Sequence, residues 1–118
     1  MNKYRNVKVE LDGYKFDSKR EAEYYQELCL RKKAGDVKEF EIKPAYEVGI
    51  RKYDQMHYLQ CRRKGKPSQA IWGQTVFTYT PDFVVDGELV DVKGFETPVF
   101  KLKAKILAAL GLPVKAVK

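Results

Sequence analysis

The amino-acid sequence predicts an α+β fold in which two helices pack on a mixed or antiparallel sheet. Several short segments alternate apolar and polar residues, as half-buried strands do, and two longer segments carry apolar residues at helical spacing. Tight-turn pairs at Asp12-Gly13 and Asp86-Gly87 join segments of strand character. The predicted order is two strands, a helix, three strands and a second helix, which is typical of the α+β class.

The first third of the chain predicts a hairpin followed by a helix. Residues 4–16 alternate apolar and polar side chains on both sides of Asp12-Gly13, which predicts a hairpin. Residues 19–34 predict a helix, because Ser18 is a suitable N-cap and Ala34-Gly35 is a suitable end.

The rest of the chain predicts strands and a second helix. Strand character is found in residues 37–50, 71–85 and 88–93. Residues 62–69 are rich in lysine and arginine and predict an exposed basic loop. A helix is expected from Thr97-Pro98 to about Leu110, because proline favours the first helical position and Gly111 favours a stop.

Length, charge and composition limit the classes of function. The chain has 118 residues, which suits one domain over residues 1–118, and its net charge of +7 favours a polyanionic partner. The single histidine excludes a zinc site with several histidines. No apolar run approaches the roughly 18 residues of a membrane span, and the N-terminus lacks the apolar stretch of a signal peptide. Two cysteines, Cys29 and Cys61, are too few for a disulfide scaffold and suggest a reducing cytoplasm.

Two aspartates face each other on the hairpin that turns at Asp86-Gly87. A two-residue loop places Asp82 opposite Asp91, and Lys93 points to the same face as Asp91. Like charges at opposed positions, with Cβ atoms about 5 Å apart, destabilise a hairpin. A divalent cation would remove that cost, because Mg²⁺ is held by one or two carboxylates plus waters. The alternative is that both carboxylates are solvated charges at a sheet edge.

A third acid, Glu21, lies on the apolar side of the first helix, beside Leu28. An acid in that position needs a cation, a hydrogen bond or a metal as partner. Ser18-Lys-Arg-Glu21 also forms a capping box, in which Glu21 accepts a bond from the Ser18 backbone N–H. Capping and metal binding both remain open, and one carboxylate can serve both.

These residues resemble a known superfamily. The motifs Ser18-x-x-Glu21, Pro81-Asp82 and Asp91-Val92-Lys93 follow the order of the PD-(D/E)XK nucleases, which is a helix acid, a strand Asp, a next-strand Asp-x-Lys and a helix. Over residues 2–110, apart from the middle segment 49–72, the chain is similar to a family of small phage-encoded proteins. That family is usually assigned to this superfamily, near the endonuclease I-type Holliday junction resolvases. The segments that carry this similarity are Asn2–Tyr4, Gly13–Tyr25 and Asp91–Gly94 followed by Thr97.

The resemblance implies a restriction-endonuclease-like αβββα core and a phosphodiesterase that depends on Mg²⁺ or Mn²⁺. It implies that Asp82 and Asp91 hold the metal, with the Val92 backbone carbonyl as a further ligand. Glu21 would bind a second metal or orient a water. Lys93 would position the attacking water and offset charge on the pentacoordinate phosphate, where a compact cation is effective.

Basic residues suggest where DNA binds. Arg62, Arg63, Lys64 and Lys66 form the densest basic cluster, and aromatic residues flank it in the sequence. The alternative is an ordinary solvated loop.

On the second helix, Lys103 projects between Leu107 and Leu110 from an apolar arc that includes Val99 and Leu102. We expect Lys103 either to snorkel to solvent or to reach a site carboxylate and a DNA phosphate.

The sequence therefore predicts a metal-dependent endodeoxyribonuclease acting on branched or structured DNA in phage recombination or replication, in the host cytoplasm. A junction has two strands to cut, so a homodimer is expected. One alternative is a DNA-binding module that keeps the fold without cleaving. Another is a nuclease subunit of a larger recombination or packaging complex.

Overall fold

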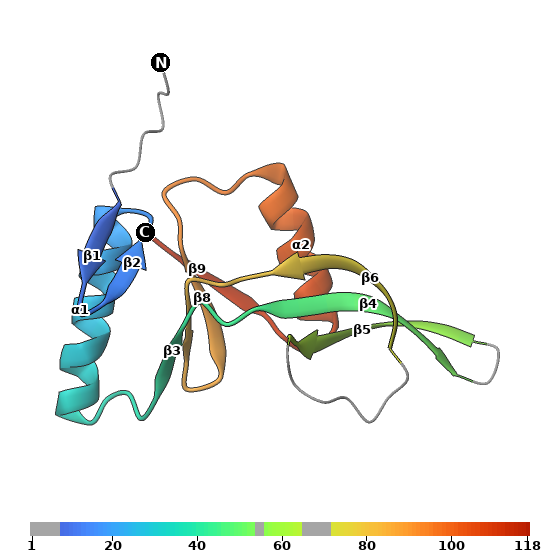
Figure 1. Cartoon of the computed structure of the whole chain (residues 1–118), viewed down its shortest axis with the longest axis horizontal. Coiled ribbons are helices and arrows are strands. Elements are labelled where there is room, and N and C mark those ends of the chain that lie inside the picture. The colour runs from blue at the N-terminus through green and yellow to red at the C-terminus, as the bar shows by residue number, and fades with distance from the viewer. Residues whose placement is uncertain (1–7, 54–55, 65–71) are drawn as a thin grey trace, which may run out of the picture. The chain divides into compact units, whose positions relative to one another are not determined.

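The computed structural model describes residues 8–53, 56–64 and 72–118 (Figure 1). The chain forms two compact units, Met1–Phe40 and Glu41–Lys118, which are described in turn. The prediction of one domain over residues 1–118 stays a prediction. Within the described residues, no helix is long and apolar enough to cross a membrane.

The first unit begins with an antiparallel hairpin of β1 (Val9–Leu11) and β2 (Tyr14–Phe16). Asp12 and Gly13 turn it with positive φ angles of 52° and 81°, a conformation that Asp-Gly pairs adopt readily. The hairpin is confirmed over these residues, whereas the predicted residues 4–7 lie outside the described part of the chain.

Helix α1 (Lys19–Ala34) has the predicted bounds. The Ser18 side chain caps its start, and Gly35 ends it at a φ of 87°, which favours glycine. Its inner face packs on the hairpin: Leu28 is fully buried, and the Tyr25 ring lies 5.1 Å from that of Phe16.

The second unit contains two sheets and one helix. An antiparallel sheet has the order β5-β4-β6, and a mixed sheet has the order β3-β7-β8-β9. The α+β class with mixed and antiparallel pairing is therefore confirmed. The elements are β3 (Phe40–Ile42), β4 (Tyr46–Tyr53), β5 (Met56–Arg63), β6 (Trp72–Tyr79), β7 (Phe83–Val85), β8 (Glu88–Val92), α2 (Pro98–Ala109) and β9 (Val114–Val117).

Two predicted strand segments are each divided. Residues 37–50 form β3 and β4, separated around Pro44, which has no N–H to donate to a ladder. Residues 71–85 form β6 and β7, separated around Pro81 for the same reason. Strand β9 was not predicted, because it is short and its pairing with β8 is parallel and non-local.

The predicted basic loop over residues 62–69 is wrong at its start. Arg62 and Arg63 end strand β5, and Lys64 lies in the turn that follows. Strand β5 pairs with β4 along its whole length, which places Arg62 directly opposite Glu47. Opposite charges at directly paired positions favour strand pairing, so Arg62 extends the strand. Residues 65–69 lie outside the described residues.

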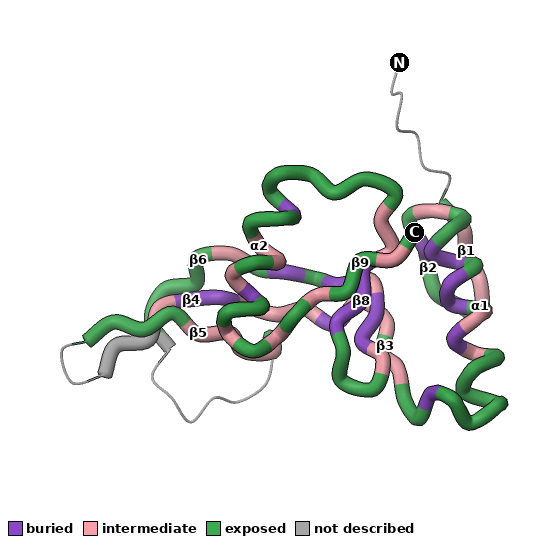
Figure 2. Tube along the Cα trace, turned by 180° about the vertical axis from the view of Figure 1, so that it is seen from behind, coloured by how far each residue is buried: buried purple, intermediate pink, exposed green. Residues whose placement is uncertain are grey.

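The two sheets and α2 share one core (Figure 2), with buried residues along β4 and β8 in purple. Its buried members are Val48, Tyr79, Val84, Leu89, Phe100 and Leu107. The predicted apolar arc of α2 is too broad, because Val99 and Leu102 are 61% and 60% exposed. At 100° per residue, Leu102 lies roughly 160° around the helix from buried Phe100.

Candidate active site

The hairpin β7–β8 has the predicted register. Val84 lies opposite Leu89, and Phe83 lies opposite Val90. Asp86 and Gly87 form the two-residue turn, with positive φ angles of 48° and 85°. The apolar residues of this hairpin enter the core, which fixes the register and carries Asp82 and Asp91 to the same end of the hairpin.

Crossed hydrogen bonds hold the two aspartates together. The backbone N–H of Asp82 donates to Oδ1 of Asp91 at 3.0 Å, and the backbone N–H of Val92 donates to Oδ2 of Asp82 at 2.8 Å. Each carboxylate thus accepts a bond from the main chain of the opposite strand. These bonds explain how two acids remain adjacent, since a backbone N–H stabilises a charged acceptor.

Asp91 is buried, with 2% of its surface exposed, so it is not a solvated edge charge. Burial raises the pKa of its carboxyl, while the Asp82 backbone N–H and the Lys93 ammonium oppose that rise. Asp82 is half-buried. The site therefore combines one deeply buried carboxylate with one more accessible carboxylate.

Tyr79 completes the surroundings of Asp91. Its hydroxyl, at the end of β6, donates a hydrogen bond to Oδ2 of Asp91. Sequence reasoning missed this contact, because it joins two different sheets. The available signal was chemical: a strand with Val76 and Phe77 ends in a tyrosine two residues before Pro81, and a buried tyrosine hydroxyl needs a partner.

Lys93 lies beside this pair. Its backbone N–H donates to the Val117 carbonyl at 2.7 Å, which ties the end of β8 to β9. Its half-buried side chain places Nζ 4.9 Å from the centre of the Phe100 ring. The Lys93 ammonium opposes the rise in the pKa of Asp91. Lys93 directly follows the last residue of β8, and its shared strand face with Asp91 stays a prediction. The structure therefore brings Asp82 and Asp91 together, and Lys93 follows Asp91 by two residues and acts on its charge.

The donor chemistry of this pair suits a hard cation. Oδ1 of Asp82 has no hydrogen-bond donor among the described residues, so one oxygen remains for a ligand. Mg²⁺ binds carboxylate oxygens and is often held by one or two of them plus waters and substrate phosphates. Among residues 8–53, 56–64 and 72–118, no cluster of three or more His, Cys, Asp or Glu is arranged to hold a metal. The Asp82–Asp91 pair therefore suits Mg²⁺ held by two carboxylates plus waters, and it is not a cluster of three or more protein ligands.

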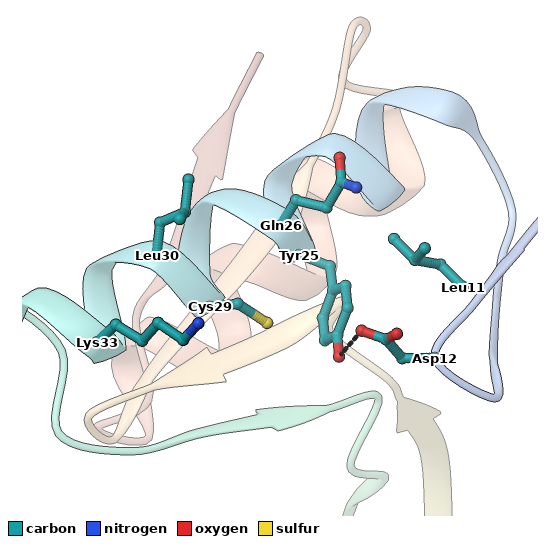
Figure 3. A pocket seen from close by; sticks show the side chains of 7 residues that line it. All are labelled: Leu11, Asp12, Tyr25, Gln26, Cys29, Leu30 and Lys33. Carbon is teal, nitrogen blue, oxygen red and sulfur yellow. Dashed lines mark hydrogen bonds between the residues drawn. The ribbon is translucent and has the colours of Figure 1, made fainter.

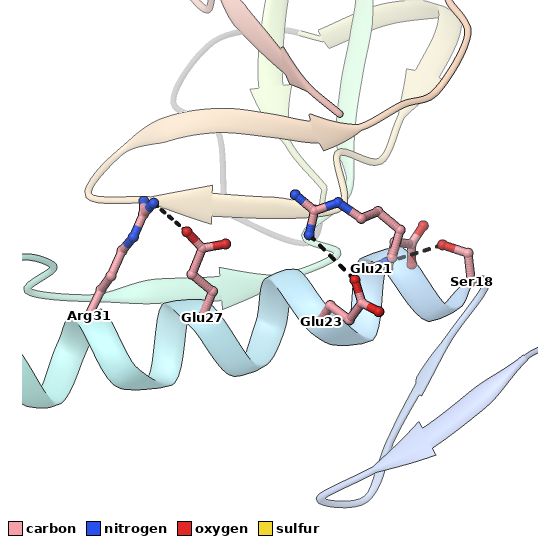
Figure 4. Close-up of polar contacts among 6 residues, drawn as sticks. Ser18, Glu21, Glu23, Glu27 and Arg31 are labelled. Carbon is pink, nitrogen blue, oxygen red and sulfur yellow. Dashed lines mark hydrogen bonds and ion pairs between the residues drawn. The ribbon is translucent and has the colours of Figure 1, made fainter.

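Glu21 caps α1 in the first unit (Figure 4). Its backbone N–H donates to Oγ of Ser18 at 3.2 Å, and its Oε2 accepts from the Asp17 backbone N–H at 3.2 Å. The bond back to the main chain thus comes from Asp17, one residue before the predicted Ser18. Glu21 is buried, with 7% exposed, while Glu23 on the outer face is exposed. The capping role is supported, and the ligand role stays a prediction.

Ion pairs occupy both arginines that the sequence predicts to bind DNA. Arg62 donates to Glu47 through Nε at 3.0 Å and lies within 2.9 Å of it through the guanidinium, and Arg63 pairs with Glu41. Lys64 is exposed, and Lys66 lies outside the described residues. The positive charge expected at this cluster is therefore partly neutralised by the protein itself.

The structure shows a contact of the Lys103 side chain, and the predicted snorkelling of this side chain to solvent stays a prediction. Lys103 is half-buried, and its Nζ lies 5.3 Å from the centre of the Phe77 ring, a cation–π contact. The contact explains how the ammonium is accommodated on the inner side of α2. Its expected approach to a site carboxylate is not seen among the described residues.

A separate groove lies in the first unit between the β1–β2 turn and α1 (Figure 3). Its volume is about 500 Å³, and the Tyr25 hydroxyl donates to Oδ2 of Asp12 at its wall, at 2.9 Å. Burial raises the pKa of Tyr25, so its hydroxyl stays protonated as this donor. The lining residues are Leu11, Asp12, Tyr25, Gln26, Cys29, Leu30 and Lys33. They include none of the predicted site residues.

Comparison with known proteins gives a family. A model described as "Protein of unknown function (DUF1064)" matches residues 1–115. The chain belongs to this family. The DUF1064 match spans both units and includes Glu21, Asp82, Asp91 and Lys93. No curated protein and no solved structure matches the chain.

Proposed function

We propose that this DUF1064 protein is a metal-dependent endodeoxyribonuclease that hydrolyses phosphodiester bonds in branched or structured DNA, as Holliday junction resolvases do. The observation that carries the proposal is the crossed hydrogen bonding that holds Asp82 and Asp91 together beside Lys93. Two adjacent acids and a lysine on one hairpin are the residue types that this chemistry needs. Their order along the chain resembles that of PD-(D/E)XK nucleases, and the proposal includes that αβββα core.

Each residue has a distinct role in the proposal. Asp82, Asp91 and the Val92 carbonyl would hold Mg²⁺ or Mn²⁺. When bound, the cation supplies a Lewis acid for the phosphate and lowers the pKa of a nearby water. The main-chain N–H groups and the Tyr79 hydroxyl fix the carboxylate orientations in advance. The Lys93 ammonium offsets negative charge that develops on the phosphate and orients the attacking water.

Glu21 has two proposed roles. It caps α1, and it would bind a second metal or orient a water.

The preference for branched DNA follows from the size of the protein. A chain of 118 residues that contains a catalytic core has little room to read base sequence, so DNA shape is the more accessible feature. A homodimer would place two sites on the two strands of a junction. The setting would be phage recombination or replication.

The strongest rival is a DNA-binding module that keeps the fold without cleaving. In that case the aspartates only accept main-chain N–H groups at the strand ends. Their bonds to the Asp82 and Val92 N–H groups support this alternative. A nuclease subunit that is inert outside a recombination or packaging complex is a further alternative.

Incubation of the purified protein with a supercoiled plasmid and with a four-way junction tests the proposal. We expect cleavage in Mg²⁺ or Mn²⁺, faster on the junction, and none in EDTA. Binding of the junction without cleavage in any metal would favour the non-cleaving module. Cleavage that continues unchanged in EDTA would contradict the metal-dependent mechanism.

A further inference from the structure

An exposed apolar surface begins directly after the proposed site. Phe95 is 77% exposed in the loop between β8 and α2, and Val99 and Leu102 are 61% and 60% exposed on α2. Val99 and Leu102 are three residues apart, so they lie on one side of the helix. Three large apolar side chains within eight residues are thus left exposed, and exposed apolar surface of this kind is a feature of interaction sites when it is continuous.

The charge of this stretch is strongly positive. From Gly94 to Lys118 the chain carries five lysines and one acid, Glu96. Lys101 and Lys105 are exposed and four residues apart, so they share the outer side of α2 with Leu102. The face defined by Phe95, Val99, Lys101, Leu102 and Lys105 is called the α2 outer face below. A second copy of this chain would bring lysines against lysines, whereas a polyanion with apolar surfaces complements both features.

Phe95 is held close to Lys93. The Lys93 backbone N–H is tied to Val117, and Thr97 caps α2 by accepting the Phe100 N–H at 3.1 Å. The loop is therefore fixed at both ends. Because Phe95 is two residues from Lys93, their Cα atoms are at most about 7 Å apart. A phosphate at Lys93 would thus have its neighbouring nucleotide within reach of the Phe95 ring.

We infer that the α2 outer face binds unpaired nucleotides next to the scissile phosphate, with a base stacked on Phe95 and the backbone on Lys101 and Lys105. The inference rests on the proposed function and names its substrate more closely: DNA with unpaired or separable bases at the cleavage point. Aromatic rings accept any base by stacking, and lysines track phosphates without reading sequence. In a paired duplex the base faces are already stacked on their neighbours, so Phe95 gains little there.

Binding measured in EDTA, where no cleavage is expected, tests this inference. Fluorescence anisotropy compares a labelled single strand, a four-way junction and a blunt duplex. We expect Phe95→Ala to weaken binding of the single strand and the junction about tenfold, because stacking contributes that much per base, with the duplex changed less than about twofold. Tyr14→Ala is the matched control, because Tyr14 is an exposed aromatic on β2, outside the α2 outer face and outside the basic segment that the sequence predicts to bind DNA.

A base analogue gives a second readout. The fluorescence of 2-aminopurine, placed unpaired beside the cleavage point, is expected to be quenched by the wild type and less by Phe95→Ala. Circular dichroism checks the fold, which the loss of an exposed ring leaves intact.

The possible outcomes separate the two proposals. If the wild type neither binds nor cuts any of the DNAs, the proposed function and this inference both fail. If the wild type cuts junctions while Phe95→Ala binds all three DNAs as tightly as the wild type, only this inference is overturned. If Phe95→Ala and Leu102→Ala convert a dimer to a monomer in sedimentation without changing DNA affinity, the face joins two copies of the chain, and the inference is overturned as well.

Discussion

The strand pairs β4–β5 and β7–β8 differ in the charges that they bring together: opposite charges on β4–β5 and like charges at the end of β7–β8. On β4–β5, Arg62 lies opposite Glu47 and donates to it, so the two charges neutralise each other. At the end of β7–β8, two acids are adjacent, and main-chain N–H groups hold them in place. Opposite charges on paired strands stabilise a sheet, whereas like charges destabilise it. The contribution of the Arg62–Glu47 pair to stability is therefore enough to explain its presence. The Asp82–Asp91 pair costs stability, so its presence needs another reason.

Burial strengthens the contrast. Asp91 is nearly inaccessible, and that burial raises its pKa, which means that its charged form is disfavoured. Residues whose environment disfavours their charge are concentrated at functional sites. The run of basic residues that the sequence predicts to bind DNA is partly used by the fold, because Arg62 and Arg63 pair with glutamates. The small acidic pair is the better candidate for chemistry.

The largest expected effect comes from the acidic hairpin. Asp82→Asn and Lys93→Ala should each slow junction cleavage at least about a hundredfold, because each removes a charge needed at the reacting phosphate. Asparagine can still accept from the Val92 N–H, so the fold and DNA binding should be retained. Glu88→Gln is the matched control, because Glu88 is exposed on the same hairpin. Near wild-type cleavage by either site variant would make the assignment wrong.

A smaller effect is expected at Glu21. Glutamine can keep the capping bond from Asp17, so Glu21→Gln removes charge without removing the cap. Cleavage should fall at least about tenfold, whereas Glu23→Gln on the exposed side should change it less than about twofold. Rates of junction cleavage measure both. Equal and small effects would leave Glu21 with capping alone.

Removing the Arg62–Glu47 ion pair should change the stability of the protein rather than its activity. Glu47→Gln leaves the partly buried Arg62 guanidinium without its charged partner and should lower the free energy of unfolding by about 1 kcal/mol. Urea unfolding measures the loss. Adding Arg62→Met should recover part of the lost stability, because the cation that no longer has the Glu47 carboxylate is then removed. If Glu47→Gln unfolds like the wild type, the pair contributes no measurable stability.

The smallest effect is expected in the salt dependence of junction binding. Each phosphate contact contributes a slope of about −0.9 in a plot of log K against log salt. Replacing Arg62, Arg63 and Lys64 together should make the slope shallower by at most about 0.9, the value of one phosphate contact. The reason is that the two arginines already have carboxylate partners. Replacing Lys101 and Lys105 should reduce the slope by about two contacts. A loss of about three contacts in the first variant would place DNA on β5.

Local signals made much of the fold predictable. The bounds of α1 follow from a serine cap and a glycine stop, and the register of β7–β8 follows from an Asp-Gly turn. These signals act within a few residues of each other. The adjacency of Asp82 and Asp91 therefore follows from the order of residues in the hairpin alone.

Non-local contacts could not be derived in this way. The bond from Tyr79 to Asp91 joins two sheets, and the parallel pairing of β9 with β8 depends on the crossover through α2. The ion pairs of Arg62 and Arg63 depend on which strand lies beside β5. The sequence predicted that those arginines lie in a DNA-binding loop, because they stand in a run of basic residues. It does not show which carboxylate will face a given arginine.

Metal binding to the DNA-free protein tests the central claim most directly, namely that Asp82 and Asp91 are held together for a cation. Calorimetric titration with Mn²⁺ in chelator-treated buffer compares the wild type with Asp82→Asn and with the Glu88→Gln control. The account predicts saturable binding by the wild type and the control, weakened at least about tenfold in Asp82→Asn, or by roughly 1.4 kcal/mol. Identical isotherms for all three proteins, or no binding by the wild type, would show that the hairpin carboxylates only cap the strand ends.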